Sequence, residues 1–316
     1  MSDSRGRILH HYGTMADAYR DWWAPMLEEL VAPVIETLTS TGRPEQWLDI
    51  GAGTGIASRR LARRLAPGSV VVSGDLVPEL LVRLRQATPG AAAVRFDATG
   101  LPMADHRFDG VISTFALHHI REQRRVLAEV HRVLKPGGQL VMVTWGADTV
   151  DCPAMLAWDE LLVDMGGPED DPEPPPSWRD DIETRDRLES LLRGIGFTEG
   201  GVTLERRTVR LDAERVIAIR RLLGGGRRRL QLLPAAVRDR FEARARKLVN
   251  GMPAEAFDFR PEVLVTRVGK PVGTAPECPS ADYRTTCPNC GAAMYDRGCK
   301  TRCPKCHFFT DCSDPW

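Results

Sequence analysis

Hydrophobic residues along the chain follow two spacings that alternate with each other. Short apolar runs rich in Val, Ile and Leu, typical of buried parallel strands, occur at residues 46–50, 69–74, 92–96, 108–114 and 139–145. Between them lie stretches with apolar residues three and four positions apart, as on amphipathic helices, at residues 56–66, 78–87 and 122–134. This alternation predicts an α/β fold with a doubly wound, mostly parallel sheet.

The alternation continues, less regularly, toward residue 270. A helix is predicted at residues 185–195 and a strand at 202–211, and a last strand at 262–268 would complete a seven-stranded sheet. Two helical stretches, 212–223 and 234–250, form a helical insertion at residues 212–250 between those strands. The acidic, proline-rich segment 166–178 is expected to be a loop, because proline interrupts helices and central strands.

The composition is that of one large domain and one small one. The chain has 316 residues, of which 42% are hydrophobic, enough for a full α/β core with length left over. Its 43 acidic and 43 basic side chains cancel, so no overall field attracts it to nucleic acid or an anionic membrane, which favours a small-molecule substrate. It shows neither a secretory signal nor an apolar run of about eighteen residues. We therefore expect a soluble cytoplasmic protein without a membrane partner, and its oligomeric state stays open.

Three glycines follow the first predicted strand in the segment Leu-Asp-Ile-Gly-Ala-Gly-Thr-Gly, residues 48–55. Gly51, Gly53 and Gly55 let the backbone turn tightly and approach a ligand that a Cβ atom would keep away. Their G-x-G-x-G spacing differs from the G-x-G-x-x-G of dinucleotide-binding proteins. The segment predicts a cofactor site at the end of the first strand.

Further segments accompany the glycine loop. Asp75 ends the second predicted strand about twenty residues beyond it, where a carboxylate can accept both hydroxyls of a ribose, although this residue alone would also suit NAD. Arg-Phe-Asp-Ala at residues 95–98 and Phe-Asp-Gly-Val-Ile-Ser at 108–113 come next. In Leu-Lys-Pro-Gly-Gly, residues 134–138, the glycines are expected to end a helix before the fifth strand.

This set of motifs resembles the class I S-adenosylmethionine-dependent methyltransferases, in particular the subgroup with ubiquinone and menaquinone C-methyltransferases and many secondary-metabolite N- and O-methyltransferases. The resemblance spans roughly residues 12–268. It implies a Rossmann-like methyltransferase domain at residues 1–270 with S-adenosylmethionine (SAM) as cofactor. It also implies in-line transfer of a methyl group to a nitrogen, oxygen or carbon of a small-molecule acceptor, whose identity it does not give.

The same resemblance implies which residues bind the cofactor. The glycine loop would hold the methionyl part, Asp49 would help to orient the ammonium group, and Asp75 would bind the ribose. Asp97 and the Ala98 backbone would read the adenine amino group. The full implied set is Tyr12, Tyr19, Asp49, Gly51, Ala52, Gly53, Gly55, Asp75, Leu76, Asp97, Ala98, Ser113, Phe115 and His118.

The N-terminal segment, residues 8–40, resembles the helix that covers the cofactor in this subgroup. Tyr12 and Tyr19 would form an aromatic wall there, since a sulfonium cation is favoured beside a π-face and the transfer benefits from the exclusion of water. At least one of Trp22 and Trp23 is better explained as a hydrophobic anchor that packs the segment on the sheet.

Methyl transfer from a sulfonium needs little acid–base chemistry, because the methyl group is already activated and the enzyme mainly aligns the reactants. A base is required only for a protonated nucleophile. His118 and His119 follow the fourth strand at the carboxyl edge of the sheet, where such a base would stand, and Tyr19 is a third catalytic candidate. Alternatively, one histidine packs beside the cofactor while the other faces solvent.

The C-terminal tail carries a second pattern. Seven of the eight cysteines lie in the last 39 residues, unlike the cysteines of a disulfide-stapled domain. Two C-x-x-C turns separated by twelve residues, Cys287 with Cys290 and Cys303 with Cys306, can bring four thiolates onto one structural Zn²⁺. We therefore expect a linker at residues 271–285 and a zinc-ribbon-like domain at 286–316. Cys299 or Cys312 could replace one of these ligands or the two could form a disulfide, and an iron–sulfur cluster is an alternative.

A second functional hypothesis is an RNA methyltransferase, in which the ribbon and a set of arginines would hold phosphates. These are Arg206, Arg207, Arg210, Arg220, Arg221, Arg227, Arg228 and Arg229. The neutral net charge favours the interpretation that residues 227–229 form a solvated loop between helices. A third hypothesis is a cofactor-binding regulator whose ribbon recruits a protein partner.

Overall fold

The computed structural model describes residues 4–38, 41–179 and 181–272, and the backbone of three short strands within residues 295–311. The chain divides into two compact units, Met1–Pro271 and Val272–Trp316. In the described residues, no helix is both long and apolar enough to cross a membrane.

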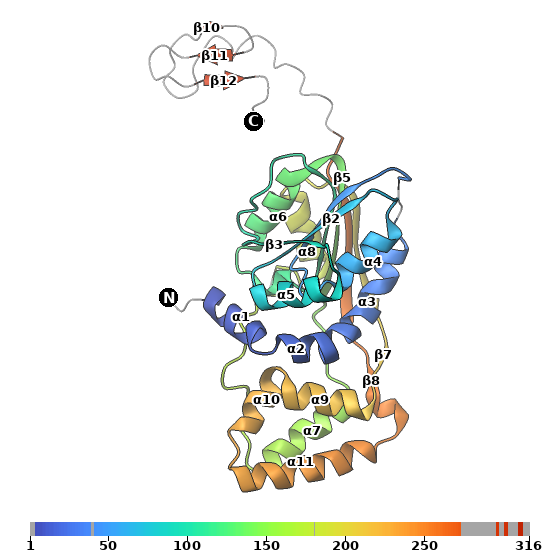
Figure 1. Ribbon diagram of the computed structural model, residues 1–316, viewed down its shortest axis with the longest axis vertical. Helices are drawn as coiled ribbons and strands as arrows, with labels where there is room; N and C mark the ends of the chain where they lie inside the picture. Colours follow the sequence, from blue (N-terminus) through green and yellow to red (C-terminus); the bar gives the residue numbers. More distant parts are fainter. Residues whose placement is uncertain are drawn as a thin grey trace. The chain divides into compact units, whose positions relative to one another are not determined.

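The first unit is built on a seven-stranded sheet with the order β3-β2-β1-β4-β5-β9-β6 (Figure 1). The bounds are β1 Gln46–Ile50, β2 Val70–Asp75, β3 Ala92–Arg95, β4 Phe108–Thr114, β5 Leu134–Trp145, β6 Glu199–Arg206 and β9 Glu262–Gly269. Strands β1 to β5 pair in parallel, whereas β9 is antiparallel to both β5 and β6. The predicted Rossmann-like sheet is confirmed, and the last strand enters it between two others rather than at its edge.

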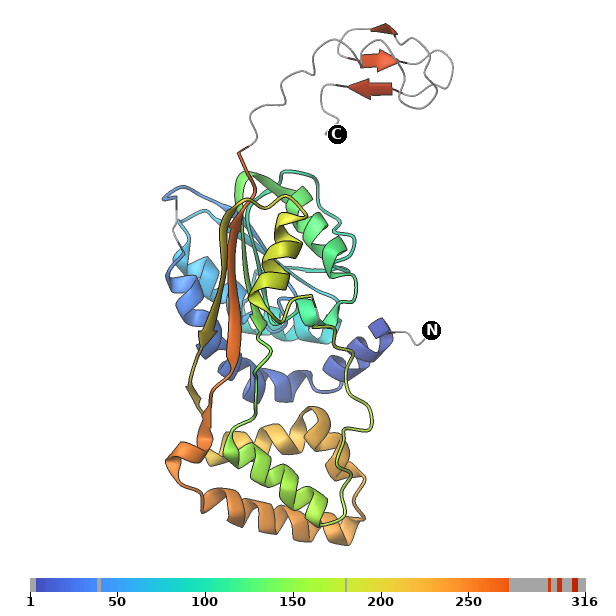
Figure 2. The same cartoon turned by 180° about the vertical axis from the view of Figure 1, so that it is seen from behind.

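Helices cover both faces of this sheet (Figure 2). Their bounds are α3 Ala24–Glu36, α4 Ile56–Arg64, α5 Pro78–Ala87, α6 Gln123–Val133 and α8 Arg185–Arg193. Neighbouring strand residues enter two different core clusters: Trp47 packs with α3 and α4, whereas Leu48 packs with α6 and α8. The near-continuous apolar runs of the sequence follow from this burial on both faces.

The N-terminal segment is not the single helix expected over residues 8–40. It consists of α1 Ser4–Gly13, the short α2 Ala16–Ala18, a π-helical turn Tyr19–Trp23 and then α3. A π-helical turn adds a residue to one helical turn and re-aims the side chains that follow it, and such turns are frequent at functional sites.

The helical insertion contains three helices, one more than the sequence pattern predicts, and a fourth helix from outside its bounds packs with them. Helices α7 Pro153–Asp164, α9 Ala213–Leu222, α10 Gly224–Gln231 and α11 Ala235–Asn250 lie together next to one end of the sheet (Figures 1 and 2). Two-residue strands β7 Val209–Arg210 and β8 Asp258–Phe259 pair beside a 3₁₀ turn, Ala254–Phe257. Residues 166–178 are irregular, as predicted.

Three expectations here are wrong, each for a physical reason. The predicted strand 202–211 is split, because its partner β9 begins opposite Arg206. Residues 227–229 are helical, not a loop, because Arg228 and Arg229 form largely buried ion pairs with Asp171 and Asp159. The glycines of residues 134–138 do not end α6, which stops at Val133; they form a bulge in β5, where Gly137 has a φ of +76°.

The second unit contains a three-stranded antiparallel sheet. Its strands are β10 Tyr295–Asp296, β11 Lys300–Arg302 and β12 Phe309–Asp311, paired in the order β10-β11-β12. The four predicted zinc ligands, Cys287, Cys290, Cys303 and Cys306, lie outside the described residues.

Candidate active site

The glycine loop between β1 and α4 requires glycine for its backbone conformation. Gly51, Gly53 and Gly55 have φ values of +71°, +55° and +83°, a region that other residues rarely adopt. A Cβ atom on Gly51 would lie 2.2 Å from the Cβ of Ala116. The loop can therefore pack against the end of β4 only because residue 51 has no side chain. The sequence pattern therefore reflects a real steric constraint at the carboxyl edge of the sheet.

A first cavity opens above this loop, where the carboxyl ends of β1, β2, β3 and β4 meet α1. Nine of the predicted cofactor residues line it: Tyr12, Tyr19, Gly51, Gly53, Asp75, Leu76, Asp97, Ala98 and Phe115. The other five, Asp49, Ala52, Gly55, Ser113 and His118, do not reach its wall. Ser113, for example, donates a hydrogen bond of 2.9 Å to the carbonyl oxygen of Ile50 and so fixes the neighbouring strands.

Asp75 is held rigidly at the wall of this cavity. One carboxylate oxygen accepts the Gly53 N–H at 2.8 Å and the other accepts the Val77 N–H at 2.9 Å. Burial raises the pKa of this carboxyl, and the backbone hydrogen bonds partly oppose that rise. Each oxygen keeps a lone pair, so the carboxylate can still accept two hydroxyls from a ligand in the cavity.

Asp49 lies beneath the loop, fully buried. Its Oδ2 accepts a hydrogen bond of 2.5 Å from the Ser58 hydroxyl, while its Oδ1 has no hydrogen-bond partner within the described part of the chain. Burial raises the pKa of Asp49 to about 7, with Asp75 adding to the rise. The orphaned oxygen is a polar group suited to a cationic ligand, although it sits behind the cavity wall rather than on it.

Asp97, two residues beyond β3, also lines the first cavity. Its Oδ1 accepts hydrogen bonds from the backbone N–H and the hydroxyl of Thr99, at 2.9 and 2.7 Å. Its Oδ2 pairs at 2.8 Å with Arg5 of α1, whose side chain is 57% exposed. Because exposed ion pairs contribute at most about 1 kcal/mol, a ligand amino group can share or displace this contact.

A second cavity adjoins the first and shares Tyr12, Tyr19, Phe115 and His119 with it. Its other lining residues are His11, Met15, Trp23, Leu27, His118, Trp145, Ile219, Arg220, Leu223 and Gly224 to Gly226. The cavity thus lies between the sheet edge, the N-terminal helices and the helical insertion, and its walls are largely aromatic and aliphatic.

Phe115 marks the junction of the two cavities. It has a φ of +52°, an unusual conformation for a bulky residue, and its ring stacks on Trp145 with 4.2 Å between centroids. Such strained positions persist where the surroundings fix them, and they concentrate at functional sites.

The two histidines after β4 have different surroundings. His119 donates from Nδ1 to the Pro176 carbonyl oxygen at 2.9 Å, so its Nε2 is the acceptor for the Tyr12 hydroxyl at 2.6 Å. His118 lines the second cavity, and its buried Nδ1 has no partner among the residues described. Burial lowers the pKa of both rings, and that of His118 well below its ordinary value, with further contributions from His119 and Arg179. Both are therefore neutral at pH 7.

Most of the arginines considered for phosphate binding are already paired. Arg220 lies 2.9 Å from Asp159, Arg229 lies 3.0 Å from the same carboxylate, and Arg228 donates to Asp171. Arg206, Arg207, Arg210 and Arg221 pair with Glu262, Glu205, Asp258 and Glu242. The ion pair of Arg229 with Asp159 ties α10 to α7, and that of Arg228 with Asp171 ties α10 to residues 166–178.

Sequence reasoning missed the residues that are special to the second cavity. Trp145 has the one usable signal, since it ends β5 at the carboxyl edge where ligands of such sheets bind. Met15, Ile219 and Leu223 come from segments far apart in the chain and carry no motif. Trp178, at the end of the loop 166–178, lines the first cavity.

Comparisons with known proteins agree with this geometry. A family model described as "Methyltransferase domain" matches residues 48–142, and one described as "Zinc finger protein-like" matches residues 285–316. A demethylmenaquinone methyltransferase from Thermus thermophilus is 38% identical over 104 residues, which is 32% of this chain and 47% of that protein. The chain spans about half the length of the first such relatives.

Two further proteins match over a larger share. A malonyl-[acyl-carrier protein] O-methyltransferase from Methylococcus capsulatus is 30% identical over 212 residues, 66% of this chain and 71% of that protein. The structure of a phosphoethanolamine N-methyltransferase 2 from Haemonchus contortus is 16% identical and has the same fold, with a TM-score of 0.50 over 86% of this chain and 61% of that one. With the motifs, the sheet order and these matches, the chain belongs to the class I S-adenosylmethionine-dependent methyltransferases.

Proposed function

We propose that the protein transfers a methyl group from SAM to a small-molecule acceptor by in-line displacement. The observation that carries this proposal is the pair of adjoining cavities, which meet at Tyr12, Tyr19 and Phe115. One cavity is lined by the carboxylates of Asp75 and Asp97, and the other is largely apolar. Two reactants bound in them would meet beside these three aromatic rings, so that the nucleophile can form a bond to the methyl carbon as the bond from that carbon to sulfur breaks.

The first cavity fits the parts of SAM. Asp75 would accept the ribose hydroxyls, Asp97 and the Ala98 backbone would bind the adenine edge, and the backbone of Gly51 and Gly53 would lie against the methionyl part. Asp49 would act from behind the loop, where its unpaired oxygen favours the ammonium group. When bound, SAM supplies a methyl group that is already activated for transfer.

The chain's own residues then orient the acceptor and exclude water. Tyr12, Tyr19, Trp23, Phe115 and Trp145 provide aromatic faces on which an unsaturated or apolar acceptor can pack. Water exclusion and fixed alignment favour an in-line attack.

Of the two histidines, His118 is the better candidate for a base. Its neutral ring lines the second cavity, where it can accept a proton from a hydroxyl or amine nucleophile, and its buried Nδ1 has no hydrogen-bond partner among the residues described. His119 uses both ring nitrogens in contacts with Pro176 and Tyr12, which makes it a positioning residue for the Tyr12 hydroxyl.

The ion pairs of the insertion favour a small molecule over RNA as acceptor. Seven of the eight arginines proposed to bind phosphates already face a carboxylate. The pairs of Arg220, Arg228 and Arg229 are largely buried, so binding phosphates would require breaking them. The pairs of Arg206, Arg210 and Arg221 are exposed and add little to this argument. The names of the relatives also point to metabolites and carrier-bound acyl groups rather than nucleic acid.

A labelling experiment tests the proposal. The full chain is incubated with SAM carrying a tritiated methyl group, together with either a metabolite extract or total RNA from the same cells. We expect label in an extractable small molecule and its loss with Asp75→Ala. Label that enters RNA alone would overturn the small-molecule acceptor.

We also propose that Cys287, Cys290, Cys303 and Cys306 bind one structural zinc. The two C-x-x-C turns and the zinc-finger match at residues 285–316 support this. Elemental analysis should find one zinc per chain, reduced by Cys287→Ser or Cys303→Ser and unchanged by Cys278→Ser in the linker. Absence of zinc, or the visible absorbance of an iron–sulfur cluster, would contradict the assignment.

A further inference from the structure

The loop that would read adenine has no regular structure of its own. Residues 96–107 connect β3 to β4 without a helix or strand, yet Asp97, Ala98 and Thr99 in this loop line the first cavity. A flexible loop would place these groups with too little precision to distinguish an adenine amino group from another substituent. Something outside the loop must therefore hold it.

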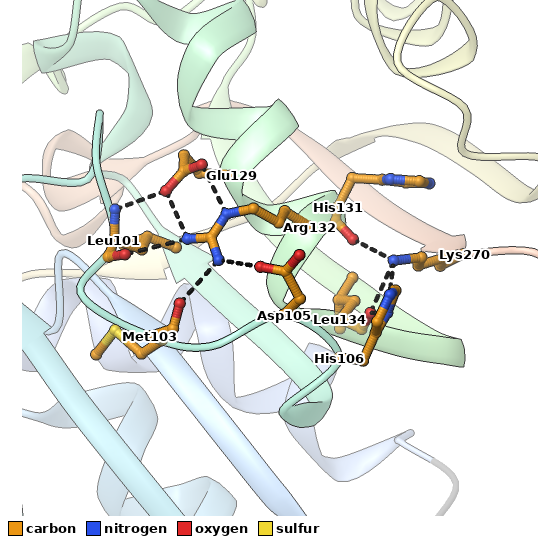
Figure 3. Close-up of polar contacts among 9 residues, drawn as sticks. All are labelled: Leu101, Met103, Asp105, His106, Glu129, His131, Arg132, Leu134 and Lys270. Carbon is orange, nitrogen blue, oxygen red and sulfur yellow. Dashed lines mark hydrogen bonds and ion pairs between the residues drawn. The ribbon is translucent and has the colours of Figure 1, made fainter. Parts of the chain in front are cut away.

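Helix α6 holds the loop through one arginine and one glutamate (Figure 3). Arg132 donates to the carbonyl oxygens of Leu101 and Met103, at 3.1 and 2.8 Å, and to the Asp105 carboxylate at 2.6 Å. Glu129, one turn earlier, accepts the Leu101 N–H at 2.8 Å. The backbone of Leu101 is thus bound at both its donor and its acceptor, four residues after Asp97.

Arg132 and Glu129, which together form a clamp on the loop, also bind each other. Arg132 donates from Nε and Nη2 to the two oxygens of Glu129, at 2.9 and 2.8 Å. Glu129 and Asp105 raise the pKa of Arg132, so the guanidinium stays protonated. Only a guanidinium offers enough donors in a fixed plane for two carbonyls and two carboxylates, so lysine cannot replace it.

Helix α6 is itself fixed at its C-terminal end. Lys270 donates to the carbonyl oxygens of His131 and Leu134, at 2.7 and 2.9 Å (Figure 3). The Leu101 side chain is 5% exposed and packs in the same core cluster as α6. The loop is therefore bound to α6 through both its backbone and the Leu101 side chain.

We propose that Arg132 and Glu129 are a positioning pair that sets the specificity for adenine. They hold residues 99–105 so that Asp97 and the Ala98 backbone keep a fixed position relative to the adenine ring. This inference rests on the proposed function, since it assumes that SAM occupies the first cavity. Neither residue touches the cavity, so their effect passes through the loop.

The test compares S-adenosylhomocysteine with its inosine analogue, in which an oxo group replaces the adenine amino group. Calorimetric titration of the wild-type full chain should favour the adenine form by about tenfold or more, because the analogue leaves Asp97 without its donor. In Arg132→Lys and in Glu129→Gln, this preference should fall below about threefold, mainly through weaker binding of the adenine form. Arg125→Lys, exposed on the same helix, is the matched control and should keep the wild-type preference.

The outcomes separate this inference from the proposed function. If wild type binds neither compound, the function itself fails. If wild type discriminates and both variants bind the two compounds more weakly by the same factor, the clamp supports folding only and the inference is overturned. Should Arg132→Lys fail to fold, Glu129→Gln decides alone, because it keeps the shape of the side chain while removing its charge and one of its two acceptor oxygens.

Discussion

The two cavities share an edge but are built from different kinds of chain. The first is made of loops at the ends of successive strands, and its geometry depends on left-handed glycines and on Asp75 bonded to backbone N–H groups. The second is lined by residues within 11–27, 115–145 and 219–226, most of them with large side chains, together with Gly224 to Gly226, which offer only backbone. Backbone-built sites tolerate few residue types, whereas a wall of side chains can change by substitution. The comparison suggests why one family keeps its cofactor while its acceptors vary.

The largest expected effect lies in the second cavity. If the nucleophile is protonated, His118→Gln should lower kcat about a hundredfold at pH 7, and leave S-adenosylhomocysteine affinity unchanged because His118 is outside the first cavity. His119→Gln should cost less, since that ring only orients Tyr12. Steady-state kinetics and calorimetry measure the two quantities. Equal turnover in wild type and His118→Gln would remove His118 as the base.

The same assignment predicts a pH profile. A base works in its neutral form, and burial places the pKa of His118 well below 6.5. Turnover should therefore stay level as pH falls from 8 to 6.5 and decline only at lower pH, and His118→Gln should lose that decline. A wild-type decline centred above pH 7 would show that another group titrates.

The next effect lies in the first cavity. Asp75→Ala should weaken binding of S-adenosylhomocysteine by about thirtyfold, roughly 2 kcal/mol for the lost hydrogen bonds to a buried carboxylate. Asp239→Ala, which removes an exposed carboxylate on α11 away from the cavity, serves as control. Unchanged affinity in Asp75→Ala would exclude the ribose contact, and thermal unfolding would show whether the loop stays folded.

A smaller effect is expected at the aromatic wall. Trp145→Ala should raise the acceptor KM about tenfold through lost ring contacts, while S-adenosylhomocysteine affinity stays within about twofold. Trp145→Phe keeps a ring against Phe115 and should recover most of the loss. If Trp145→Ala weakened cofactor binding as much as acceptor binding, the two cavities would not be separable sites.

The sequence predicts the first cavity far better than the second, for reasons that particular residues make clear. Gly51, Gly53 and Asp75 are required by local backbone geometry, and local requirements leave local patterns. Helix α10 depends instead on Arg228 meeting Asp171 and Arg229 meeting Asp159, pairs separated by more than fifty residues. Contacts between residues so far apart leave no periodicity in the sequence. The pattern therefore predicts a loop at residues 227–229, where the structure has a helix. Asp49 shows the converse. The motif places it next to the glycine loop, as in the structure, but its burial beneath the loop depends on tertiary packing that the motif does not contain.

The most direct test of the account is a calorimetric titration of the full chain with S-adenosylhomocysteine and, separately, with NAD. Two carboxylates, Asp75 and Asp97, and two glycines of the G-x-G-x-G loop line the first cavity, a combination suited to the nucleoside and methionyl parts of SAM rather than to a pyrophosphate. We predict saturable binding of S-adenosylhomocysteine at one site per chain and weaker or undetectable binding of NAD. Tighter binding of NAD, or no binding of S-adenosylhomocysteine by folded protein, would contradict the assignment of this cavity.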